Sequence, residues 1–78
     1  MAEFVYKTVS AFEGSIEHVK RLLEKRGLNY PCPTISETVS LWTGQGWEVV
    51  SVNETNQFGN HTDDWSARQF AIVLKKSR

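Results

Sequence analysis

The stretch TISETVSLWTGQGWEVVSV, residues 34–52, contains a helix start, a helix end and a strand. Thr34 and Glu37 have the spacing of a capping box, in which each side chain accepts a hydrogen bond from the other's backbone amide. The glycines of Gly44-Gln45-Gly46 end the helix, because glycine tolerates the left-handed backbone that follows a helix. Trp47–Val52 is rich in β-branched residues, which predicts a strand immediately after the helix.

A strand and a second helix are predicted on the N-terminal side of this stretch. Residues 4–12, FVYKTVSAF, alternate as a strand does, with Val5 and Val9 on one face. Residues 15–26 follow as an amphipathic helix, capped by Ser15 and ended at Gly27. Its apolar stripe consists of Ile16, Val19, Leu22 and Leu23. The prolines in residues 28–33 exclude a continued helix and predict a linker.

On the C-terminal side, residues 68–75, RQFAIVLK, alternate as a further strand. Between the two C-terminal strands lie residues 53–66, which are polar and show no periodicity, and which we expect to form a long loop. The order β-α-α-β-β predicts a single α+β domain over residues 1–78. We expect a three-stranded antiparallel sheet with two helices packed on one face, and with more apolar material on the other face than solvent contact requires.

Composition excludes several classes of protein. The chain has 78 residues, 40% of them hydrophobic, which is too apolar for a disordered segment. Nine basic side chains balance nine acidic ones, so nucleic-acid binding is not favoured. One cysteine and two histidines exclude an internal disulfide and the usual four-ligand zinc site, and we expect no metal or cofactor. Neither a signal peptide nor a long apolar run is present, so we expect a cytoplasmic protein with no membrane association.

Several short motifs resemble a known family. These are Tyr6-Lys7 in the first strand, a helix ending on Gly-x-Gly, the strand start Gly46-Trp47-Glu48, and the final strand Ala71–Lys76. Together they resemble a family of short bacterial and phage proteins classed as a domain of unknown function. The resemblance covers residues 4–10 and 34–76, and this chain differs by its helix 15–26 and its longer loop. The resemblance implies a small α+β fold and no catalytic residues.

The residues with catalytic potential do not form a recognisable motif. Cys32 has no neighbour in the sequence that would lower its pKa, and His18 lies among charged residues of a helix. His61 with Asp63 and Asp64 is the densest polar cluster, but it lacks the spaced oxygens of a calcium loop. We therefore predict that the protein is not an enzyme.

The preferred function is a protein-interaction or regulatory module, expected to be a homodimer. The loop would present Phe58, His61, Asp64 and Trp65 to a protein partner, because tryptophan is enriched at interface hot spots. The alternative is a small-ligand binder for a nucleotide or metabolite, held in a dimer crevice that is lined by aromatic residues and by Arg68 or Lys7. An enzyme using His61 with Asp63 or Asp64, and an RNA-binding sheet, are the less favoured alternatives.

Overall fold

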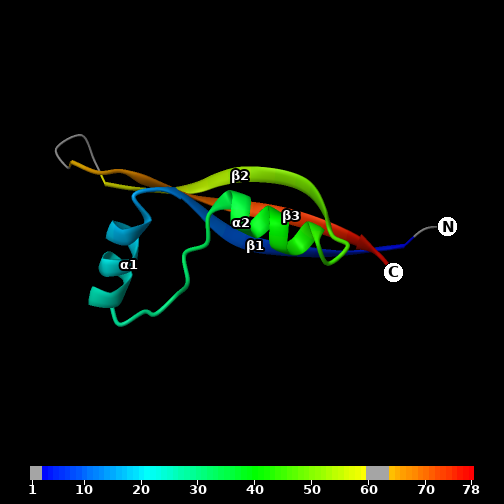
Figure 1. The fold of residues 1–78 in the computed structure, drawn as a ribbon, viewed down its shortest axis with the longest axis horizontal. Helices are drawn as coiled ribbons and strands as arrows, with labels where there is room; N and C mark the ends of the chain where they lie inside the picture. Colours follow the sequence, from blue (N-terminus) through cyan, green and yellow to red (C-terminus); the bar gives the residue numbers. More distant parts are fainter. Residues whose placement is uncertain (1–2, 60–63) are drawn as a thin grey trace.

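The computed structural model describes residues 3–59 and 64–78 and contains five elements. In chain order these are β1 (Phe4–Gly14), α1 (Ile16–Lys25), α2 (Ile35–Thr43), β2 (Glu48–Phe58) and β3 (Ala67–Ser77). The strands form one antiparallel sheet in the order β1-β3-β2, so the last strand lies in the middle (Figure 1). The α+β class and the predicted element order are therefore confirmed.

The predicted capping box is present at the start of α2. The backbone N–H of Thr34 donates to Glu37 Oε1 at 3.1 Å, and the Glu37 N–H donates to Thr34 Oγ1 at 3.1 Å. After the helix, Gly46 has a φ of 91°, a value that L side chains rarely adopt, and β2 begins two residues later. The predicted roles of Thr34, Glu37 and Gly46 are confirmed.

The helix α2 covers one face of the sheet. Its apolar side chains Ile35, Val39 and Trp42 pack against a buried cluster of Ala11, Ile72 and Leu74. Val9 pairs with Ile72 and Lys7 with Leu74 across the β1–β3 ladder, so these side chains point to the same side. This cluster is the larger part of the core.

The helix α1 packs against the other face, which differs from the expectation that both helices share one. Val19 of α1 is fully buried against Phe12 and Ala67. Phe12 follows Ala11 directly in β1, and successive residues of a strand point to opposite faces. The linker changes sides at the free edge of β1, where the Phe12 N–H donates to the Pro33 carbonyl at 2.8 Å.

The strand β2 extends to Phe58, further than the sequence predicts, so the connection to β3 is only residues 59–66. The register shifts between Val49 and Ser51 and between Glu54 and Asn56, as a β-bulge does. The polar residues of β2 remain paired with β3 on both sides of the second shift. The expected long loop over residues 53–66 was wrong because residues 53–57 are polar yet still pair with the central strand. Within the described residues, no helix is long and apolar enough to cross a membrane.

The domain is long and thin. Its extents are 52 × 24 × 17 Å and its radius of gyration is 14.6 Å, against about 11.5 Å for a compact domain of this length. The helices lie at different positions along the strands, with α2 beside the middle of the sheet and α1 beside one end (Figure 1). Much of the face that α1 only partly covers is therefore left without a helix.

Candidate functional site

The first candidate surface is the uncovered part of the sheet, called the open face here. It consists of Phe4, Tyr6, Thr8 and Ser10 from β1, Ser51 and Asn53 from β2, and Ala71 and Val73 from β3, which share one side in the strand registers. Tyr6 and Phe4 are 65% and 40% exposed, although both are large aromatic residues. The helix α1 reaches only as far as Phe12 on this side.

The second candidate surface is a groove of about 460 Å³ at the α1 end of the open face. Its apolar walls are Phe12, Leu23, Tyr30, Pro31, Pro33 and Phe58. The rings of Phe12 and Phe58 lie 6.5 Å apart between centroids and are inclined by 38°. The prolines of the linker hold one wall in an extended conformation, because each proline fixes its own φ and restricts the residue before it.

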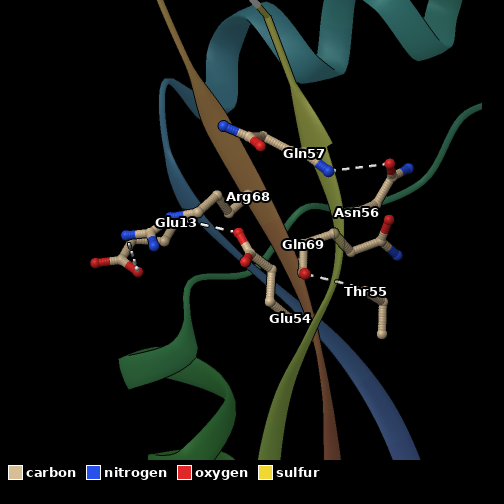
Figure 2. A network of polar contacts seen from close by, with 7 residues as sticks. All are labelled: Glu13, Glu54, Thr55, Asn56, Gln57, Arg68 and Gln69. Carbon is tan, nitrogen blue, oxygen red and sulfur yellow. Dashed lines mark hydrogen bonds and ion pairs between the residues drawn. The ribbon is translucent and has the colours of Figure 1, made fainter.

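Polar side chains lie among these walls, namely Ser10, Arg26, Asn56 and Gln69. Gln69 Nε2 donates to Ser10 Oγ at 3.4 Å, and the Gln57 backbone N–H donates to Asn56 Oδ1 at 3.0 Å. Both bonds occupy acceptor atoms, so the Ser10 hydroxyl proton and the Asn56 amide protons remain available as donors. Figure 2 shows Asn56 and Gln69 extending to the same side of the sheet.

Arg68 lies on the opposite side of the sheet from that groove (Figure 2). Its guanidinium is 3.5 Å from Glu13 Oε2 and 3.8 Å from Glu54 Oε1, so two carboxylates already balance its charge. Lys7 is likewise engaged, with its ammonium 4.0 Å from the centroid of the Trp42 ring. Lys7 pairs with Leu74, six positions from Arg68, which corresponds to roughly 20 Å along the strand. The structure therefore does not bring the two predicted anion-binding residues together.

The four predicted partner-binding residues do not form one exposed surface in the described part of the chain. Phe58 and Trp65 are half-buried and pack against the cluster around Val19, instead of projecting as exposed anchors. Trp65 also stacks on the His18 ring. Asp64 is exposed, and His61 lies outside the described residues.

The residues considered for catalysis lie apart. Cys32 is buried and free, its thiol donates weakly to the Tyr30 carbonyl at 3.8 Å, and burial raises its pKa more than the nearby Lys20 charge lowers it. His18 belongs to α1 and contacts Trp65. Within residues 3–59 and 64–78, no group of three or more His, Cys, Asp or Glu side chains is placed to hold a metal ion.

Sequence reasoning missed the groove because its polar residues come from the three strands and from the end of α1. Ser10, Asn56 and Gln69 are small or neutral side chains on neighbouring strands, and only the register places them side by side. The one local signal was the Pro31-Cys32-Pro33 segment, which predicts a rigid extended wall. Comparisons with protein-family models, with curated proteins and with solved structures find no match to this chain.

Proposed function

We propose that this protein is a non-enzymatic interaction module that forms a homodimer through its open face. The observation that carries the proposal is that Tyr6 and Phe4 remain exposed on the part of a sheet face that neither helix covers. The helix α2 already buries one face of the sheet, and the second face, if it contacted only water, would be polar. Exposed aromatic side chains on it are typical of an interaction surface.

The surface area of the chain supports a partner of similar size. Its accessible surface is 5582 Å², whereas a compact monomer of this mass exposes about 4800 Å². The excess of roughly 800 Å² equals the area that each partner contributes to a standard protein interface. A second copy that covers the open face would bury the surface area that the thin shape of the single chain leaves exposed.

The chemistry of the open face suits packing against an identical face. Its centre carries small, uncharged side chains, Thr8, Ser51 and Ala71, beside Val73, so two backbones could approach to the usual distance of about 10 Å between packed sheets. The charge beside Tyr6 on this face is balanced, because Lys75 lies between Tyr6 and Glu48 in the register and its Nζ is 3.5 Å from Glu48 Oε2. A two-fold axis through the face would bring each aromatic residue against the partner copy.

The absence of catalysis is part of the same proposal. The most nucleophilic side chain, Cys32, is buried with a raised pKa, so its reactive thiolate form is disfavoured. A cytoplasmic location, which this proposal includes, fits a chain with one cysteine and therefore no internal disulfide framework.

Native mass spectrometry and sedimentation velocity test this proposal with two matched variants. Tyr6→Asp places a charge on the open face, whereas Tyr30→Asp places the same charge on the linker, where the tyrosine is 60% exposed. We expect the wild type and Tyr30→Asp to be dimers at micromolar concentration and Tyr6→Asp to be a folded monomer. A monomeric wild type, or a Tyr6→Asp protein that remains dimeric, would overturn the proposal.

A further inference from the structure

We infer that the groove between α1, the linker and the sheet binds a small aromatic carboxylate. The groove shares Ser10 with the open face but is otherwise lined by different residues, and its ligand binding is measured separately from dimer formation. It rests on three properties of the groove: its size, its aromatic and proline walls, and the donors that line it.

The size and shape of the groove fit a one- or two-ring molecule. Its volume of about 460 Å³ falls within the range of small-molecule sites, which is roughly 300–1000 Å³. Phe12 is 5% exposed and forms the floor, and the tilted Phe58 ring stands beside it. Tyr30 and Pro31 form the facing wall, so a planar apolar ring would contact aromatic or proline surface on both sides.

The polar groups of the groove supply several hydrogen-bond donors, beside the Gln69 side-chain oxygen and the Tyr30 hydroxyl, which can also accept. Asn56 Oδ1 and Ser10 Oγ already accept bonds within the chain, which leaves their amide and hydroxyl protons to donate. Arg26 adds a guanidinium, which has donors and no acceptor. A carboxylate matches this set, because its two oxygens accept only.

The charge of the groove selects an anion with a single charge. Among the residues that line it, Arg26 is the one charged side chain, and no carboxylate is present. No carboxylate of the described residues lies within 4.0 Å of Arg26, in contrast to Arg68 with its two. One guanidinium balances one carboxylate, whereas a phosphate ester or nucleotide would bring more charge than the groove offsets.

A titration with 2-naphthoate, followed by amide NMR spectra of the uniformly labelled protein, tests the site. We expect shifts concentrated at residues 10, 12, 30, 56, 58 and 69, which line the groove on the three strands and the linker. The neutral analogue 2-naphthamide has the same rings without the charge. It should bind about tenfold more weakly, which is the effect of losing one charge-assisted hydrogen bond.

Two variants complete the test. Arg26→Gln removes the guanidinium and should weaken 2-naphthoate binding about tenfold while leaving 2-naphthamide binding unchanged. Lys25→Gln removes the neighbouring cation, which does not line the groove, and should change neither. Equal affinities for acid and amide, or equal effects of the two variants, would overturn the assignment, as would shifts outside the groove. Diffusion coefficients from the same samples report the oligomeric state separately.

Discussion

The imidazole of His18 stacks on the indole of Trp65, with ring centroids 4.9 Å apart and planes inclined by 14°. This contact joins the first turn of α1 to the segment that leads into β3. Trp65 also packs against the buried cluster that contains Val19 and Phe12. The indole of Trp65 therefore stabilises the position of α1, which contacts the sheet only near one end of the strands.

Replacement of Trp65 by alanine should destabilise the fold. We expect a loss of about 2 kcal/mol in the free energy of unfolding, below the 3–5 kcal/mol of a fully buried tryptophan because this one is half-buried. Urea denaturation followed by circular dichroism would measure it. His18→Ala, as a control, should lose less than about 1 kcal/mol, since the ring it removes is exposed. Unchanged stability of Trp65→Ala would instead support an exposed anchor.

Two glycines with positive φ should respond differently to the same substitution. At Gly14, with φ 99°, an added Cβ would lie 2.6 Å from the Ser66 carbonyl oxygen and 2.9 Å from Ala67 Cα. At Gly27, with φ 77°, the same atom would meet nothing within 4 Å.

The cost at Gly27→Ala is then conformational alone, about 1 kcal/mol. Gly14→Ala should lose at least about 3 kcal/mol, because the clash is with backbone atoms and adds to that conformational cost. Thermal unfolding of the two variants beside the wild type provides the comparison. Equal losses would show that the backbone of Ser66 and Ala67 does not lie close enough to Gly14 to clash with an added Cβ.

The capping box predicts a pH dependence. The hydrogen bonds from the Thr34 backbone and side chain hold the pKa of Glu37 below its ordinary value. A lowered pKa in the folded state contributes stability above the unfolded pKa, and that contribution is lost as the pH falls through the folded pKa. The melting temperature should therefore fall as the pH is lowered through the folded-state pKa of Glu37.

Thr34→Ala tests the assignment by removing the hydroxyl that accepts from Glu37. It should cost about 1 kcal/mol at neutral pH and move the pKa of Glu37 upward in an NMR titration of its carboxyl group. Ser36→Ala, at an exposed position of the same helix, is the control and should leave that pKa unchanged. If Thr34→Ala leaves the titration unaltered, the Thr34 side chain does not contribute to the lowered pKa, and the bond from the Thr34 backbone N–H is the cause.

Burial of Cys32 predicts slow thiol chemistry. Because burial raises the pKa of the thiol, the folded state favours the neutral form, and its contribution to stability is lost as the pH rises through the folded pKa. Iodoacetamide should label the native protein much more slowly at pH 8 than the urea-unfolded chain, as followed by mass spectrometry. Equal labelling rates would show that the thiol is accessible and the linker open.

The sequence predicts the elements of this fold well where the signal is local. The capping box of Thr34 and Glu37 and the turn at Gly46 act within a few residues, and both are confirmed. The choice of face for α1 is not local. The apolar stripe of α1 predicts that the helix packs against the sheet. The face that it covers depends on where the linker crosses the edge of β1, which is at Phe12 and Pro33.

The far end of β2 was missed for a related reason. Residues 53–57 are polar and carry no strand propensity, yet the central strand supplies partners, as when the Thr55 hydroxyl donates to the Gln69 carbonyl at 3.3 Å. Because β2 continues to Phe58, both Phe58 and Trp65 pack against the cluster that contains Val19 of α1. The groove could not be predicted because it exists only once three separate segments have met.

The position of β3 between β1 and β2 has a consequence for the order in which the chain folds. The β2–β3 pair is a hairpin closed over a short connection, whereas the β1–β3 pair joins Gly14 to Ala67 across most of the chain. Closing a longer loop costs more entropy and takes longer, so the hairpin should form first and the docking of β1 should limit the rate. Until β1 docks, one edge of β3 carries unpaired backbone groups, and in that interval the chain is most exposed to intermolecular strand pairing.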